Sequence, residues 1–213
     1  MNVIGPPRRP EIDQYAIKFI IGAIAFSLPF IEWYLTGHSL TSISQSFWWP
    51  DPWPRNVFVG FLFAIAALLL SYNGQTEVEM WLTKVASLAG FLIAMFPCAC
   101  DPPETEIIPH LHEVSAAAMF VVLAAFCYIF MRRARAKGHR EARWRSYIYA
   151  VCGAGTIVGF VLFAIYLWSH KDPLLLYGEW AGLASFGVSW LTASHVLPVI
   201  NRASERQSLF ART

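Results

Sequence analysis

Apolar residues along this chain are grouped into six long stretches, and charged residues stand almost only between them. Each stretch is close to the length of about 20 residues that an α-helix needs to cross a hydrocarbon core of about 30 Å. Backbone polar groups inside lipid must be satisfied within the segment, which makes a helix the form expected of each stretch. The pattern therefore predicts six transmembrane helices, over residues 15–34, 57–72, 80–96, 114–131, 147–168 and 176–199.

The composition favours the same class of protein. Of the 213 residues, 56 % are hydrophobic and only 14 % are charged, whereas soluble domains carry about 25 % charged residues. The segment before the first stretch contains acidic residues and proline, with no small-residue cleavage site at the right distance, so we expect a retained span rather than a signal peptide. No linker is long enough to separate domains. The expected fold is all-α, a single six-helix transmembrane domain over residues 1–213.

Basic residues are concentrated in three segments that six spans would place on one side of the membrane. The densest is "RRARAKGHREARWR", residues 132–145, and the others hold Arg8, Arg9, Arg202, Arg206 and Arg212. Loops rich in Lys and Arg stay on the cytoplasmic side, so both termini are predicted to be cytoplasmic. Nucleic-acid binding would need aromatic residues interleaved with the basic ones, and Trp144 alone does not supply them, so no nucleic-acid partner is expected.

The opposite, outer side carries most of the remaining polar residues. Glu32, Glu113 and Glu179 fall at or inside the edges of predicted spans, where an ionisable side chain is costly. Arg55 precedes the second span and is a candidate partner for one of these carboxylates. The alternative is that each side chain simply reaches the interface by snorkelling. A site, if the protein has one, is expected to open outward.

One outer loop, "FPCACDPPETEIIPHLHE" at residues 96–113, is rich in potential metal ligands. Thiolate, imidazole and carboxylate groups bind zinc, so the candidate ligands are Cys98, Cys100, Asp101, His110 and His112. However, C-x-C followed by H-x-H matches none of the common zinc spacings. A solvated acidic connector without a site is one alternative. A disulfide between Cys98 and Cys100 is another, disfavoured because a single residue separates them.

Four segments, "SLTSISQSFWW", "RNVFVGFLFAIAALLLSYNG", "HLHEVSAAAMFVVLAAF" and "FGVSWLTASH", resemble a group of uncharacterised bacterial six-span membrane proteins. This resemblance implies a multi-pass protein of the bacterial inner membrane with one outward-facing cluster of Ser42, Ser44, Arg55, His110, His112 and Ser115. The topology is also similar to the Frag/DRAM/Sfk superfamily, associated with lipid handling, and to the CREST superfamily of intramembrane metal-dependent hydrolases. The CREST pattern needs a further histidine pair in a late span, where this chain has only His195.

The leading hypothesis is an outer-leaflet pocket that binds the head group of a membrane lipid. Its ligand-binding residues would be Arg55, Ser42, Ser44 and Glu179, with the Arg55 guanidinium pairing with an anionic group. If the pocket is catalytic, His112 is the expected general base, Glu113 or Asp101 its orienting carboxylate, and Ser115 a further hydrogen-bonding group. Two alternatives stay open, a non-enzymatic accessory or scaffold subunit of a larger membrane complex and a metal-dependent intramembrane hydrolase.

Overall fold

The computed structural model describes residues 13–99, 108–169 and 172–207. These residues form six α-helices, three short 3₁₀ helices and no strand. The α-helices are α1 (Gln14–Leu35), α2 (Pro52–Ser71), α3 (Glu77–Met95), α4 (Leu111–Ala136), α5 (Arg140–Ser169) and α6 (Asp172–Ala193), and the first 3₁₀ helix, η1 (Ser44–Trp48), precedes α2. Helices α1 to α5 are long and apolar enough to cross a membrane. The predicted all-helical membrane fold is confirmed.

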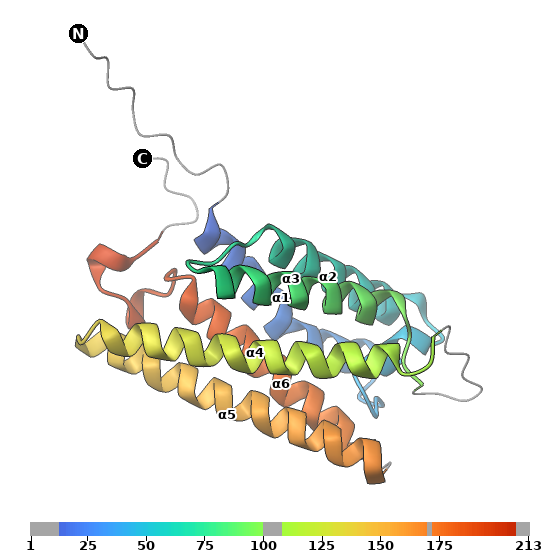
Figure 1. Ribbon diagram of the computed structural model, residues 1–213. Helices are drawn as coiled ribbons and strands as arrows, with labels where there is room; N and C mark the ends of the chain where they lie inside the picture. The colour runs from blue at the N-terminus through green and yellow to red at the C-terminus, as the bar shows by residue number, and fades with distance from the viewer. Residues whose placement is uncertain (1–12, 100–107, 170–171, 208–213) are drawn as a thin grey trace.

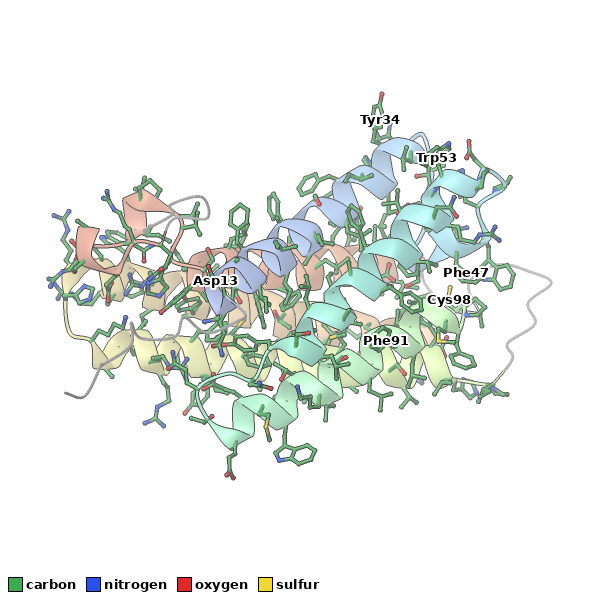
Figure 2. All side chains as sticks on the ribbon, turned by 90° about the horizontal axis from the view of Figure 1, so that it is seen from above. Asp13, Tyr34, Phe47, Trp53, Phe91 and Cys98 are labelled. Carbon is green, nitrogen blue, oxygen red and sulfur yellow. The ribbon has the colours of Figure 1, made fainter. Side chains whose placement is uncertain are left out.

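The helices form one closed bundle. Each packs against the next in sequence, as the short connections require, and α1 also packs against α6 (Figure 1). Figure 2 shows Asp13 at one end of the bundle and Phe47, Trp53 and Cys98 at the other. We call the end with Asp13 and the α4–α5 connection, residues 137–139, the basic end. The end with η1 and Cys98 is called the loop end.

Polar caps set where several helices begin. The Asp13 carboxylate accepts the Tyr15 N–H at 2.8 Å before α1, and the Asp51 carboxylate accepts the Trp53 N–H at 2.9 Å before α2. Such caps satisfy backbone donors that have no partner in the first turn. Proline also fits the first turn of α2, where its missing N–H costs nothing. Helix α2 therefore begins at Pro52, earlier than the apolar stretch alone predicts.

The centre of the bundle is aromatic. Trp190 on α6 is fully buried, and its ring meets the rings of Tyr72, Phe126 and Phe186 edge to face, with centroids 5.3, 5.6 and 5.4 Å apart. Edge-to-face contact is the favoured arrangement for aromatic pairs. These residues come from the end of α2, from α4 and from α6, so the cluster ties together helices that are distant in sequence.

Glycines bring α6 close to both of its neighbours. A Cβ at Gly159 of α5 would lie 2.6 Å from the Gly178 carbonyl oxygen, and a Cβ at Gly22 of α1 would lie 2.6 Å from the Leu191 backbone nitrogen. Neither separation leaves room for a side chain. Small residues allow helix backbones to approach closely in lipid, where no hydrophobic force drives the helices together. Glycines therefore allow α6 to approach both α5 and α1 closely.

Helix α6 is shorter than predicted. It ends at Ala193, whereas the predicted span continues to Val199. His195 has a positive φ of 59°, and Pro198 starts a separate 3₁₀ helix, η2 (Pro198–Ile200). A positive φ is not helical, and proline has no N–H and disfavours helical geometry in the residue before it, so both residues favour a helix end before Pro198. The last residues of the predicted sixth span instead turn at the basic end.

Candidate functional site at the loop end

Four of the predicted site residues meet at the loop end. Ser42 and Ser44 lie just before and at the start of η1, His112 lies in the first turn of α4, and Glu179 lies in α6. Both serines and the histidine are buried. Hydrogen bonds join all four side chains, although the serines are 135 or more residues from Glu179 in sequence.

Apolar anchors hold the serine segment in place. Ile43, between the two serines, is buried in a cluster with Leu40 and with Phe58 and Leu62 of α2. Because the Ile43 side chain faces this cluster, the backbone and the serine hydroxyls are left to face α6. The alternation of a polar, an apolar and a polar residue therefore produces one buried apolar contact and one polar surface.

Glu179 receives a complete set of donors from that segment. The Ser42 hydroxyl lies 2.9 and 3.0 Å from its two carboxylate oxygens, and the Ser44 hydroxyl lies 2.6 Å from Oε1. The backbone N–H groups of Ile43 and Ser44 also donate to it, the second at 3.3 Å. Hydrogen bonds to a charged group contribute about 1.5–3 kcal/mol each. Two hydroxyls and two amides thus form a site that the protein fills with its own carboxylate.

His112 continues this chain of hydrogen bonds. Its Nδ1 lies 2.8 Å from the Phe96 carbonyl oxygen at the end of α3, and its Nε2 lies 3.2 Å from the Ser44 hydroxyl oxygen. A carbonyl only accepts, so Nδ1 carries a proton. Ser44 has a single hydroxyl proton to share between Glu179 and Nε2. When Ser44 donates to Glu179, Nε2 must be protonated; when Ser44 donates to Nε2, Glu179 must be protonated.

The number of protons on Glu179, Ser44 and His112 determines which proton transfers these groups allow. When Ser44 is hydrogen-bonded to both groups, one proton beyond that on Nδ1 is shared by Glu179 and His112, and Ser44 connects them. The pair is therefore neutral overall, which suits its apolar surroundings. A proton can pass between the two groups through the Ser44 hydroxyl without any change in net charge.

The proposed catalytic partners of His112 do not occupy their expected places. The Phe96 carbonyl, rather than Glu113, orients the imidazole through Nδ1. Glu113 is half-buried, and its Oε2 has no hydrogen-bond partner among the described residues. Ser115 is buried further along the first turns of α4, and its hydroxyl is not part of the Glu179–Ser44–His112 chain. Asp101, the other expected orienting carboxylate, lies outside the described residues.

Arg55 is not brought to this cluster. It is exposed in the first turn of α2 and lines a separate hollow with Phe47 and Met95. Within the described parts of the chain it forms no ion pair. The buried face of α2 passes through Pro54 and Phe58, and a helical step of one residue turns Arg55 away from that face.

Glu32, unlike Arg55, is turned into the bundle. This residue of α1 is fully buried, so the snorkelling alternative does not hold for it. The polar neighbour of its carboxylate is the buried hydroxyl of Ser46 in η1, and no basic side chain of the described residues pairs with it. An ionisable residue at a predicted span edge is therefore buried here, as its position in the sequence suggested, but without the Arg55 partner considered for it.

The structure describes three of the five predicted metal ligands. Cys100 and Asp101 lie outside the described residues. Cys98 is disulfide-bonded, and a disulfide sulfur is not the thiolate that binds zinc. His110 is exposed and has a positive φ of 59°. No group of three metal-binding side chains is found in the described part of the chain, and the metal site stays a prediction.

Comparison with known proteins gives no relative from which a function could be transferred. No family model matches the chain, and no curated protein or solved structure matches it either. The resemblances inferred from sequence motifs therefore stay predictions.

The structure also contains a polar cluster that sequence reasoning missed. It lies at the basic end and includes Lys18, Arg133, Arg145, His195 and Glu205. From the sequence, the basic run indicates topology, and a polar site is expected only at the outer side. The spacing of residues in α5 could have indicated that Arg145 is buried. Arg145 falls at helical spacing from Ala142 and Tyr149, which are both buried.

Proposed function

We propose that this protein binds a membrane lipid at the loop end, with the lipid head group against Ser44 and His112. The observation that carries the proposal is a cavity of about 270 Å³ whose wall includes Ser44, His112, Glu113 and Glu179. Exposed His110 also borders this cavity, which places its polar part at the end of the bundle. Lipid head groups lie at this level of a membrane-spanning bundle.

The rest of the cavity suits an apolar chain. Phe163 of α5 and Leu175 of α6 line it as buried side chains, and Leu167 of α5 lines it as an exposed one. A second cavity of about 90 Å³ borders the same Ser44 and His112 and is otherwise almost entirely apolar. Ligand sites typically combine an apolar wall with a few placed polar groups. An amphiphile fits this arrangement better than a wholly polar solute does.

The charges indicate which head group is favoured. The Glu179–Ser44–His112 chain is neutral overall, Glu113 adds a carboxylate to the wall, and the exposed Arg55 lies at another hollow. Among the described residues that line this cavity, none is a lysine or an arginine. A head group with an ammonium donor would instead donate to Glu113 Oε2, which has no hydrogen-bond partner among the described residues. This replaces the anionic head group expected from Arg55.

Acyl transfer at Ser44 is a less suitable function, although Ser44 and His112 lie at the distance of a nucleophile and its base. Such chemistry needs backbone N–H groups directed at the developing oxyanion. The nearest candidates are the N–H groups of Ile43 and Ser44, and both already donate to Glu179. The arrangement supports binding rather than hydrolysis.

The proposal is tested by filling the cavity. Ala116 of α4 lines both cavities, so Ala116→Phe places a ring in the space assigned to the lipid. Ala117, the next residue, is half-buried as well but lines neither cavity, which makes Ala117→Phe the matched control. Native mass spectrometry after purification in mild detergent should find lipid on the wild type and on Ala117→Phe, and none on Ala116→Phe.

Equal lipid retention by all three proteins would contradict the proposal. A protein chain that co-purifies in stoichiometric amount with all three, without lipid, would favour the accessory-subunit alternative. The head-group assignment has its own test, because Glu113→Gln removes the carboxylate while keeping its size. This variant should retain less phosphatidylethanolamine relative to phosphatidylglycerol than the wild type does.

A further inference from the structure

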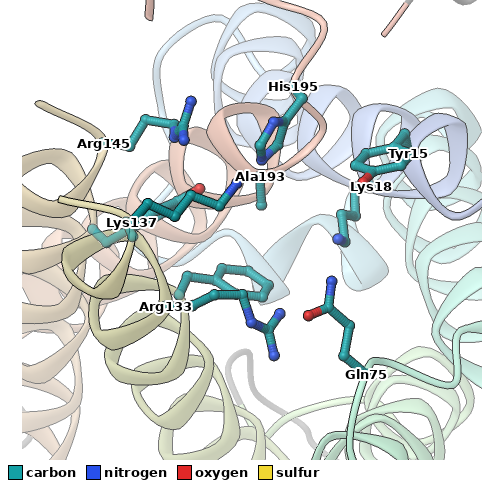
Figure 3. A pocket seen from close by; sticks show the side chains of 11 residues that line it. Tyr15, Lys18, Gln75, Arg133, Lys137, Arg145, Ala193 and His195 are labelled. Carbon is teal, nitrogen blue, oxygen red and sulfur yellow. The ribbon is translucent and has the colours of Figure 1, made fainter. Parts of the chain in front are cut away.

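A cavity of about 250 Å³ opens at the basic end, and its wall is strongly cationic (Figure 3). Lys18 of α1, Arg133 of α4, Lys137 at the end of α4 and Arg145 of α5 all line it. None of the described residues that line it is an aspartate or a glutamate. Three helices and the residue that follows α4 thus direct positive charge into one space.

The carboxylates behind this wall do not balance the charge. Glu79 pairs with Arg133, and Glu205 pairs with Lys137 at 2.7 Å and with Arg145 at 2.9 Å. Two carboxylates therefore lie near four basic side chains, two lysines and two arginines. The cavity is left with an excess of positive charge near its wall.

His195, also on the wall, does not add to this charge near neutral pH. Burial lowers its pKa, and the positive charges of Arg145 and Lys137 lower it further, to about 4. The imidazole is therefore neutral and able to donate or accept a hydrogen bond. Glu205 responds to the same cations in the opposite direction, because hydrogen bonds from Lys137 and Arg145 outweigh its partial burial and lower its pKa to about 2.

Lys18 is the group whose environment is incomplete. It is only 5 % exposed, and its ammonium lies 5.2, 5.3 and 5.8 Å from the ring centroids of Tyr15, Tyr72 and Phe130. Aromatic faces attract a cation, but they do not satisfy its three N–H donors. Among the described residues Lys18 has no hydrogen bond and no ion pair, and Figure 3 shows its ammonium directed into the cavity. Burying a charge without such a partner is costly.

Arg145 has an ion pair with Glu205, but its set of hydrogen bonds is incomplete. Its side chain is 1 % exposed, and Nη1 donates to the Ile200 carbonyl oxygen at 3.1 Å and to Asn201 Oδ1 at 2.6 Å. Its Nη2 has no hydrogen-bond partner among the described residues. The guanidinium is thus fixed by one nitrogen while a second donor group remains available. Guanidinium and ammonium groups held in this way are typical ligands of phosphate.

We propose that the cavity at the basic end binds a phosphate group, held by the Lys18 and Lys137 ammonium groups and the Arg133 and Arg145 guanidinium groups. The phosphate belongs either to a soluble phosphate compound or to the head group of an anionic lipid, since both present the same oxygens. This site lies at the opposite end of the bundle from the lipid cavity between α4, α5 and α6. Phosphate binding at the basic end can therefore be tested independently of the proposed lipid binding.

Binding is tested on the full chain in phosphatidylcholine nanodiscs at constant ionic strength, so that general screening does not change. One series measures Tm as inorganic phosphate replaces chloride, because a ligand of the folded state raises Tm. A second adds phosphatidic acid and measures its retention by native mass spectrometry. We expect a response in at least one series. A rise of Tm with inorganic phosphate identifies a soluble ligand, and retention of phosphatidic acid alone identifies a lipid head group.

The variants decide whether the response belongs to this cavity. Lys18→Met keeps the length of the side chain and removes its charge, and should weaken binding by about tenfold or more. Lys84→Met is the matched control, because Lys84 lies on α3, donates to the Leu70 carbonyl oxygen and does not line the cavity. Ala116→Phe should leave the response unchanged.

Two outcomes would overturn the proposal. One is the absence of any response in both series, and the other is a response that Lys18→Met leaves intact. If Lys18→Met does not fold, Lys137→Gln takes its place, because the Lys137 side chain is 36 % exposed and its loss is tolerated more easily. Unchanged binding by a folded Lys137→Gln would then also overturn the proposal.

Discussion

The two ends of the bundle bury charged groups in opposite ways. At the loop end, Glu179 is a carboxylate surrounded by two hydroxyls and two backbone amides. At the basic end, four cations line a cavity and Lys18 has no acceptor among the described residues. At the loop end, the protein's own Glu179 carboxylate occupies the anion site. At the basic end, four cations surround a cavity.

This difference indicates how each end contributes to the molecule. A fully hydrogen-bonded buried carboxylate stabilises the surrounding segment and fixes its conformation. An excess of buried cations lowers stability, and it persists only where another requirement maintains it. Glu179 is therefore expected to be structural in the first place and Lys18 to be functional. Substitutions at the two positions should change stability in opposite directions.

The largest effect is expected for Glu179→Gln. The amide keeps the size of the side chain but turns an NH₂ group toward hydroxyl and N–H donors, which leaves buried donors unsatisfied. The free energy of unfolding should fall by about 3 kcal/mol, measured as a lower Tm in mild detergent. Glu113→Gln is the control, and it should cost less than about 1 kcal/mol, the usual value of a charge near a helix N-terminus. Equal losses in both variants would contradict the structural role of Glu179.

A smaller effect of opposite sign is expected for Lys18→Met. In phosphatidylcholine nanodiscs without added inorganic phosphate or anionic lipid, removal of a buried charge without an ion pair should raise the free energy of unfolding by about 1 kcal/mol. Lys84→Met should instead lower it, because that ammonium donates to the Leu70 carbonyl oxygen and to Asn73 Oδ1 at 3.2 Å. A comparison of the three Tm values checks the prediction. A lower Tm for Lys18→Met would show that its aromatic neighbours stabilise the cation sufficiently.

The smallest effect is expected for Arg55→Ala. The side chain is exposed and belongs to neither cluster, so the free energy of unfolding should change by less than about 0.5 kcal/mol. Lipid retention in native mass spectra should also be unchanged. Loss of lipid in this variant would restore the head-group contact expected from the sequence and would exclude the donor-bearing head group proposed from Glu113.

The sequence contained part of the loop-end site. Glu179 was expected there because an ionisable residue at a span edge is costly. Ser42 and Ser44 were expected there from the resemblance to six-span membrane proteins, and His112 from that resemblance and from its ability to act as a general base. Their pairing was not predictable, since Ser44 and Glu179 are 135 residues apart and only the packing of η1 against α6 brings them together. Sequence reasoning also placed Arg55 in this group. One helical step separates Arg55 from buried Pro54, and an unaligned sequence does not reveal which of the two faces inward.

The sequence by itself determined that this is an all-helical membrane protein, where most of its helices lie and which end is basic. These properties are local or collective, since hydrophobicity is summed over about 20 residues and the positive-inside effect counts charges without regard to direction. Only the tertiary structure decided which charged groups turn inward. Arg145 is buried while Arg143, two residues before it, is exposed, because the packed face of α5 includes one position and not the other. The loop-end cluster and the cationic cavity both depend on that rotation of each helix against its neighbours.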